Sequence, residues 1–298
     1  MQRPTQPADR MDDRRIQLVK QRLKQKQSEI WDEYDSYPTP ELFHFTTPCG
    51  FRGITEKRQL WCTDIRYVND SREGDHGMSV IRSVMQRKSI YKPFKDSVLA
   101  AESLFGMKIN FTAYICCFCS AGEQEYMWRD YAAAGTGCAL VFDHAALISA
   151  SEGGKRYGFL RVMYDPDKQV RQVEQTLDHA IHLERELGTS GRSARMRYWL
   201  EVLVALFTCA IRFKDAKWRQ ENELRIFIAE GPGVTPFNAA DKPRVSVAFE
   251  PHSLKRVIRG PAAANDLITE KIKDLLDQNG SEAVPVVNSS IKKSATLF

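Results

Sequence analysis

The sequence lacks any apolar run long enough to cross a membrane. The best candidate, Tyr198–Ile211, is shorter than the roughly 18 apolar residues that a span needs and contains Glu201. The opening residues, MQRPTQPADRMDDRR, also lack the apolar core of a secretory signal. We therefore expect a cytoplasmic protein with no membrane partner.

The sequence also lacks the short motifs that identify many enzymes. It has no Walker loop, no G-x-G-x-x-G and no G-x-S-x-G. The acidic loop from Asp70 to His76 fits neither an EF-hand nor a zinc signature. We expect no bound metal, and the function has to be inferred from less specific features.

A disulfide framework is absent too. The seven cysteines are odd in number, and Cys116, Cys117 and Cys119 lack the gaps between ligands that zinc sites use. We interpret these three residues as thiols of a core strand in a reducing compartment.

The composition is that of a globular protein. Of 298 residues, 43% are hydrophobic and 27% are charged, which is enough to build one large domain or two small ones. The net charge of +5 permits an anionic partner without requiring one.

A basic helix is predicted over 14–37, where Ile16, Val19, Leu23 and Ile30 fall near one face. Its basic residues are Arg14, Arg15, Lys20, Arg22, Lys24 and Lys26. Two interpretations are open: a solvated helix packed through a narrow apolar stripe, or a basic arm that binds nucleic acid. Because Pro38 and Pro40 follow, we predict a helical arm over residues 1–38 and one domain over 39–298.

The rest of the chain alternates between strand and helix patterns. Thr47 and Pro48 predict a helix start that follows a short strand, with Thr47 as the N-cap. Further strands are predicted at QLWCTD, INFTAYICCFCS, GCALVFD, FLRVMYD, ELRIFIAE, RVSVAFE, LKRVIRG and PVVNSS. The segment from Ile65 to Gly77 is predicted as a loop, and most of the stretch from Pro166 to Arg212 as helices. These patterns predict an α+β fold with inserted helices.

Three groups of residues could carry chemistry. In the strand Leu42–Thr46, alternation places His44 and Thr46 on the face opposite Phe43 and Phe45, where they could line a cleft. In the last third of the chain, Glu221, Glu223 and Arg225 are predicted on one face of a strand.

Two interpretations of these carboxylates and the guanidinium are open. They form an ion pair on a surface strand, or they line a cleft in which one carboxylate stabilises a developing cation. The segment EYMWRDY adds the third group, and its residues are Tyr126, Trp128, Arg129 and Tyr131. They form either core packing or a stacking wall for a flat ring.

The order of five segments resembles a known family. They are L-x-H-[FY]-T, LWCTDIRYVND, CFCSAGEQEYMWRDYAAAGTGCALVFD with its W-x-x-Y, K-x-x-x-W-x-x-E-x-E-x-R, and IRGPAA. From Leu42 to Ala263 the chain resembles a bacterial family catalogued as a domain of unknown function. That family in turn resembles a distant branch of the ADP-ribosyltransferase superfamily.

The resemblance implies a split β-sheet that holds NAD. It gives His44 a hydrogen bond to a ribose hydroxyl, Glu223 the stabilisation of the oxocarbenium-like state, and Glu221 the deprotonation of the acceptor. Arg129 or Arg225 would meet the pyrophosphate. The aromatic residue that holds nicotinamide stays open among Tyr67, Tyr126, Trp128 and Tyr131.

The implied function is NAD-dependent ADP-ribosyl transfer to a protein or nucleic acid, in a toxin or a phage-defence effector. Two alternatives remain: an NAD glycohydrolase or RNA 2′-phosphotransferase-like enzyme, and a non-catalytic module that binds nucleic acid. The enzymatic reading predicts that His44 and Glu221/Glu223 lie on neighbouring central strands and open into one pocket.

Overall fold

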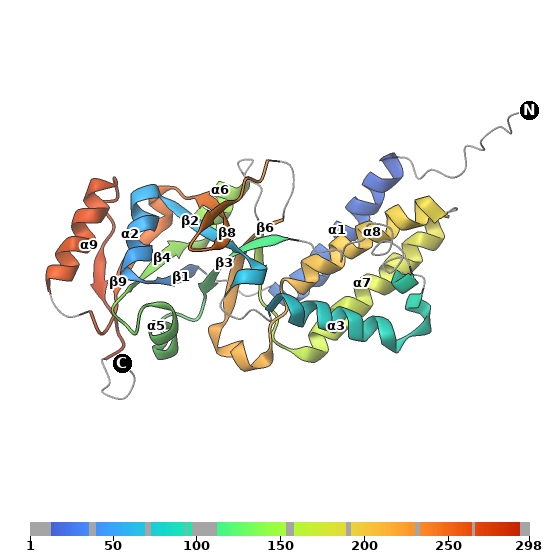
Figure 1. Cartoon of the computed structure of the whole chain (residues 1–298), viewed down its shortest axis with the longest axis horizontal. Coiled ribbons are helices and arrows are strands. Elements are labelled where there is room, and N and C mark those ends of the chain that lie inside the picture. The colour runs from blue at the N-terminus through green and yellow to red at the C-terminus, as the bar shows by residue number, and fades with distance from the viewer. Residues whose placement is uncertain are drawn as a thin grey trace, which may run out of the picture. The chain divides into compact units, whose positions relative to one another are not determined.

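The computed structural model divides the chain into two compact units, whose elements are labelled in Figure 1. It describes residues 13–35, 40–68, 73–92, 94–96, 112–152, 158–188, 192–229, 233–263 and 266–292. One unit is helical and is built from three separated segments, 1–36, 69–112 and 163–217. The other, made of 37–68, 113–162 and 218–298, contains the β-sheet.

The sheet unit contains ten described strands in the order β10-β9-β4-β1-β3-β2-β8-β7, with β6 paired to β3 and β5 to β6. The strands are β1 (Glu41–Thr46), β2 (Gln59–Asp64), β3 (Ala113–Cys119), β4 (Cys138–Asp143), β5 (Gly158–Arg161), β6 (Glu223–Ala229), β7 (Phe237–Ala239), β8 (Lys242–Ala248), β9 (Leu254–Arg259) and β10 (Val286–Asn288). The β9–β10 pair is parallel. The α+β class predicted from the sequence is confirmed.

The sheet branches at β3. Strand β6 pairs with β3 along its whole length, from Ala113↔Ala229 to Cys119↔Glu223. The other edge is shared: β1 meets it at Cys119, and β2 meets it at Tyr114 and Ile115. The middle of this β3 edge, between Ile115 and Cys119, therefore pairs with neither β1 nor β2. His44 lies close to this part of the edge.

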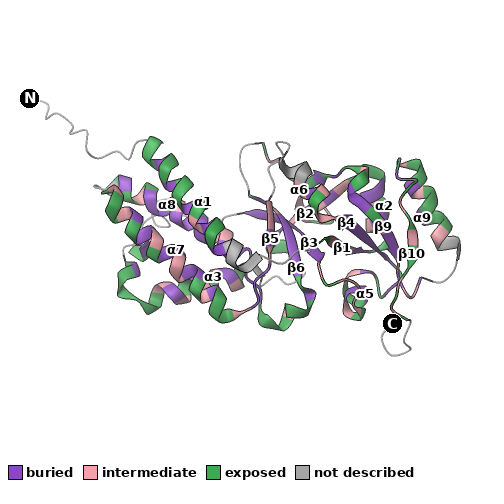
Figure 2. Cartoon of the chain, turned by 180° about the vertical axis from the view of Figure 1, so that it is seen from behind, coloured by how far each residue is buried: buried purple, intermediate pink, exposed green. Residues whose placement is uncertain are grey.

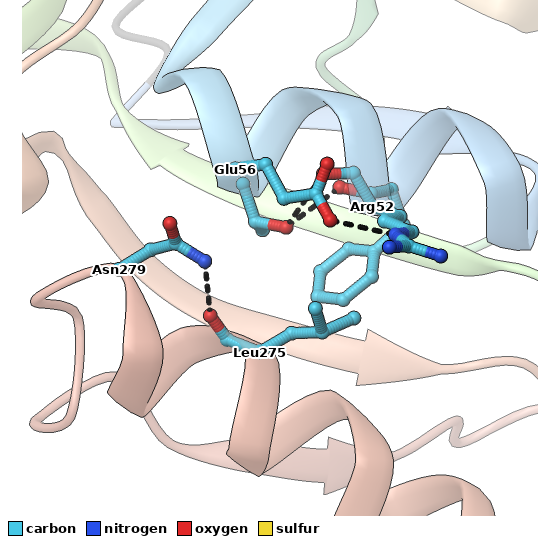
Figure 3. A network of polar contacts seen from close by, with 6 residues as sticks. Arg52, Glu56, Leu275 and Asn279 are labelled. Atoms are coloured by element: carbon cyan, nitrogen blue, oxygen red, sulfur yellow. Dashed lines mark hydrogen bonds and ion pairs between the residues drawn. The ribbon is translucent and has the colours of Figure 1, made fainter.

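Four described helices accompany the sheet: α2 (Pro48–Lys57), α5 (Glu125–Tyr131), α6 (His144–Glu152) and α9 (Asp266–Gln278). The predicted start of α2 is confirmed, because the Thr47 hydroxyl accepts a hydrogen bond from Gly50 N. Figure 3 shows the Arg52–Glu56 pair on α2 and the bond from Asn279 to the Leu275 carbonyl on α9.

Apolar cores cover both faces of the central strands, which are largely buried (Figure 2). One core joins Leu42, Phe118, Leu140 and Ile226 to residues of α2 and α9. The other joins Phe43, Phe45 and Cys119 to residues of α5. Since His44 follows Phe43, it lies on the face of the first core.

The helical unit contains α1 (Asp13–Asp35), α3 (Glu73–Arg87), α7 (Pro166–Leu187) and α8 (Arg192–Ala210), around its own apolar core. Helix α3 begins at Glu73, inside the segment that the sequence predicted to be a loop. Part of that segment, including Asp70, lies outside the described residues. No helix in the described ranges is both long and apolar enough to span a membrane.

Helix α1 belongs to the core of the helical unit. Val19 is fully buried, Leu23 is 3% exposed, and the Gln27 amide donates to the Ala205 carbonyl of α8. The two units divide between residues 36 and 37, close to the predicted boundary, and α1 packs with α8 in the helical unit.

We expect Leu23→Ala to destabilise the helical unit by about 2–5 kcal/mol, because truncating a buried leucine loses apolar contacts and leaves a cavity. Leu18→Ala is the matched control in the same helix, since Leu18 is 37% exposed, and it should change stability by less than about 0.5 kcal/mol. Chemical denaturation of both variants measures the difference. Equal losses would contradict the packing of α1.

An ion pair fixes the start of β1 to β9. Glu41 accepts from Arg256 Nη1 and Nη2 at 2.7 Å each, and Lys255 Nζ lies 3.0 Å away. The hydrogen bond from Arg256 is the largest cause that lowers the pKa of Glu41 from its ordinary value of 4.5 to about 2. The guanidinium of Arg256 also lies over the Phe43 ring.

This lowered pKa predicts a pH-dependent contribution to stability. A carboxylate with a lowered folded-state pKa stabilises the fold above pH 4.5, and the contribution disappears as the pH falls toward about 2. Because Glu41 is partly exposed, we expect about 1–2 kcal/mol at neutral pH. Unfolding of the wild type and Glu41→Gln should differ at about pH 6 and converge at low pH. A gap that is constant with pH would contradict the assignment.

Candidate functional site

His44 is half-buried beside the open part of the β3 edge. Its Nδ1 lies 3.0 Å from the Cys117 carbonyl, and its ring lies 5.6 Å from Phe118. Because a carbonyl only accepts, Nδ1 carries the proton. Burial lowers the pKa of His44 and the Cys117 bond opposes that shift. The ring is therefore neutral at pH 7, with Nε2 as an acceptor that has no hydrogen-bond partner among the described residues.

Thr46 shares the His44 face but is less accessible. It is 9% exposed, and its hydroxyl lies against Gly50 in the first turn of α2, where no Cβ would fit. Thr46, which was predicted to line a cleft and to contact NAD together with His44, therefore lies against α2.

Glu223 and Arg225 form a buried ion pair on β6. Glu223 is 3% exposed and Arg225 is fully buried. Arg225 Nε lies 2.6 Å from Glu223 Oε1, and Nη2 lies 3.1 Å from Oε2. Both carboxylate oxygens of Glu223 thus accept from one guanidinium, which fixes their orientation and offsets their charge.

Glu221 lies beside a tyrosine. Its Oε1 accepts a hydrogen bond from Tyr131 Oη at 2.8 Å, and the side chain is 4% exposed. Glu221 was predicted on the strand with Glu223, which is wrong. It ends the short helix η4 (Ala216–Glu221), and Asn222, with φ of 41°, separates it from β6.

The remaining aromatic candidates have other surroundings. Trp128 is fully buried, and its Nε1 donates to Glu123 Oε2 at 3.2 Å. Tyr126 packs against the core that contains Phe45. Tyr67 is 44% exposed, with the Arg66 guanidinium over its ring. Tyr131 is thus the candidate that the structure places against Glu221.

Arg129, expected to meet a pyrophosphate, is exposed and bonds its neighbour Asp130 at 2.7 and 2.9 Å. Arg225, the other candidate, is held by Glu223. Neither guanidinium is presented on an open surface without an acidic neighbour.

The structure does not bring His44 together with the glutamates. Strand β3 lies between β1 and β6, so the prediction of neighbouring strands is wrong. Phe43, Cys119 and Glu223 face one another across the three strands and share one side of the sheet. His44, one residue along, points to the opposite side. His44 on β1 and Glu223 on β6 are also two strand spacings apart, which is about 10 Å across the sheet.

The thiols of β3 are mostly buried. Burial raises the pKa of Cys116 to about 12 and that of Cys119 to about 11, whereas Cys117 is exposed. Protonated thiols are poor metal ligands. Within the described ranges no three His, Cys, Asp or Glu residues are grouped as metal ligands would be.

The basic face of α1 is partly neutralised within its own unit. Lys20 pairs with Glu201, Arg22 with Glu186, and Lys26 with Glu29. The other basic residues, Arg14, Arg15 and Lys24, are exposed. This arrangement favours a solvated helix packed by its apolar stripe over a nucleic-acid-binding arm.

Sequence reasoning missed Glu123, which organises the loop before α5. Its carboxylate accepts from Trp128, from the Ser289 hydroxyl, and from the backbone N and hydroxyl of Ser290. No local pattern marks the contacts with Ser289 and Ser290, because these residues lie 166 and 167 positions further along the chain. It also missed the outward side of β2, which carries Gln59, Trp61 and Thr63.

One family comparison bears on this site. Residues 127–226 match the model of a family described as a protein of unknown function, DUF2971. The matched segment begins in α5 and ends in β6, so it contains Tyr131, Glu221, Glu223 and Arg225 but not His44.

Searches of curated proteins and of solved structures returned no match. About a third of the chain, including the carboxylate cluster, is therefore similar to this family of unknown function.

Proposed function

We propose that the protein transfers ADP-ribose from NAD to a macromolecular acceptor, with Glu221 and Tyr131 at the reacting end of the site. The observation that carries the proposal is the 2.8 Å hydrogen bond between Tyr131 Oη and Glu221 Oε1. Cleavage of NAD needs an aromatic surface for nicotinamide and a carboxylate near the ribose. Tyr131 supplies the aromatic ring and Glu221 supplies the carboxylate, and the hydrogen bond between them holds the two groups together.

The chemistry follows from these groups. The bond between C1 of the ribose and the nicotinamide nitrogen breaks, and its electron pair leaves with nicotinamide, which becomes neutral. Positive charge develops on the ribose C1 and ring oxygen, where the Glu221 carboxylate stabilises it. A nucleophilic atom of the acceptor then bonds to C1, and its proton passes to a carboxylate or to water.

The roles implied by the resemblance change in this proposal. Glu221 replaces Glu223 as the group that stabilises the cation, because Arg225 binds both oxygens of Glu223. Glu223 and Arg225 become positioning residues that hold the start of β6. His44 keeps β1 close to β3 through Cys117 and is not assigned a contact with the reacting sugar.

The test is release of nicotinamide from NAD with labelled ADP-ribose, with and without protein and nucleic-acid acceptors. Transfer of the label supports the proposal. Release without transfer indicates a glycohydrolase, and loss of a 2′-phosphate from RNA indicates the phosphotransferase alternative. If the folded protein neither binds nor consumes NAD, the proposal is wrong.

A further inference from the structure

The edge of the sheet formed by β2, β8 and β7 has one buried side and one open side. Leu60, Cys62, Val245 and Val247 point into the apolar core. Residues on the other side are half-buried or exposed, and Trp61 lies opposite the exposed Ser246. This side of the edge therefore presents its side chains to solvent.

Aromatic rings lie on this open side. Trp61 packs edge-on against Phe237, with ring centroids 5.5 Å apart and planes at 74°. Phe237 is 36% exposed. A large apolar ring that is left at the surface of a sheet is available to stack on a planar ligand.

Cations surround the Trp61 ring. The Arg244 guanidinium lies 5.1 Å from the ring centroid, and Lys57 Nζ lies 5.6 Å from it. Arg244 Nε also donates to the Ala239 carbonyl, which orients the guanidinium. Lys242, two residues before Arg244 on β8, lies on the same side of that strand by alternation and adds a third cation to this side of the sheet edge.

The cations of this surface differ from those of α1 in their partners. Among the described residues, Lys57, Lys242 and Arg244 form no ion pair, whereas Lys20, Arg22 and Lys26 of α1 each form one. Burial lowers the pKa of Arg244 without an opposing carboxylate. The charge on this surface is thus available to a ligand.

We propose that Trp61, Phe237, Lys57, Lys242 and Arg244 form a binding surface for single-stranded nucleic acid, which we call the Trp61 surface. Exposed bases stack on aromatic rings irrespective of sequence, and cations beside the rings bind the phosphates. An acidic peptide would use the cations but not the stacking face, so the ring pair favours nucleic acid. The proposal is independent of NAD chemistry.

The test is binding of a fluorescent single-stranded oligonucleotide of roughly 20 nucleotides to the full chain at several salt concentrations. Trp61→Ala should weaken binding by at least about fivefold, because one stacked base is lost. Trp61→Phe should keep most of the affinity. Lys57→Ala/Arg244→Ala should reduce the slope of log K against log salt by about 1.4, since each contacted phosphate contributes about 0.7 for a single strand.

The matched control is Lys271→Ala/Lys273→Ala, which removes the same charge from the exposed side of α9. It should leave affinity and slope unchanged. An equal loss in this control, no binding by the wild type at low salt, or equal competition by polyglutamate would overturn the proposal. Thermal melts of each variant exclude misfolding, and if Trp61→Ala does not fold, the salt slope of the double variant decides.

Discussion

Replacing Glu221 by Gln is expected to lower nicotinamide release from NAD by about 100- to 1000-fold, the typical effect of removing one preorganised electrostatic group. The amide keeps the size of the side chain and can still accept from Tyr131, whose hydroxyl lies 2.8 Å from the carboxylate. Only the negative charge is lost, so binding of NAD should persist while turnover falls. Single-turnover release beside NAD titration measures both quantities.

Glu125→Gln is the matched control, because Glu125 is an exposed carboxylate on α5, the helix that carries Tyr131. It should leave turnover unchanged. Tyr131→Phe should reduce turnover by about tenfold or more, since it removes a hydrogen bond to a charged group but keeps the ring. If folded Glu221→Gln releases nicotinamide as fast as the wild type, the role assigned to Glu221 is wrong.

Replacing Arg225 by Met is expected to destabilise the protein by about 3–5 kcal/mol, because the substitution leaves the carboxylate of Glu223 buried without its guanidinium. Glu223 and Arg225 are 3% and 0% exposed. The double variant Glu223→Gln/Arg225→Met should recover much of the loss, since it removes the uncompensated charge as well. Chemical denaturation of the two single variants and the double variant measures the coupling.

Arg52→Met is the control for this pair. Arg52 Nε and Glu56 Oε1 are also 2.6 Å apart, but both side chains are exposed. An exposed pair of the same length is screened by solvent, so its loss should destabilise the protein far less than loss of the buried pair. If the two arginine substitutions cost the same, burial does not set the importance of the Glu223–Arg225 pair.

Local features of this fold could be predicted from the sequence, because neighbouring residues determine them. Thr47 and Pro48 identify the start of α2, and alternation in β1 separates His44 from Phe43 and Phe45. The same alternation places Leu224, Ile226 and Ile228 in the core. In each case the physical cause lies within a few residues of its effect.

Features that depend on distant pairing could not be predicted. Strand β3 pairs with β1 on one edge and with β6 on the other, so it lies between His44 and Glu223, and residues far apart in the chain set both pairings. Glu221 lies outside the strand because Asn222, between Glu221 and β6, adopts a positive φ. Asparagine tolerates this conformation better than most residues. The contact of Glu221 with Tyr131 spans 90 positions.

The packing partners of α1 could not be predicted from the sequence either. Its apolar stripe was visible in the sequence, but a stripe does not identify what it packs against. Only the structure shows that Val19 and Leu23 join residues of α3, α7 and α8 in one core. The sequence pattern therefore left open both a packed helix and a basic arm.

A crystal structure of the Glu221→Gln variant with intact NAD tests the central claim most directly. The account predicts the nicotinamide ring against Tyr131 and the C1 atom of its ribose beside the amide at position 221, on the side of the sheet that carries Glu223. NAD bound against His44 on the opposite side, with Tyr131 and position 221 untouched, would contradict it.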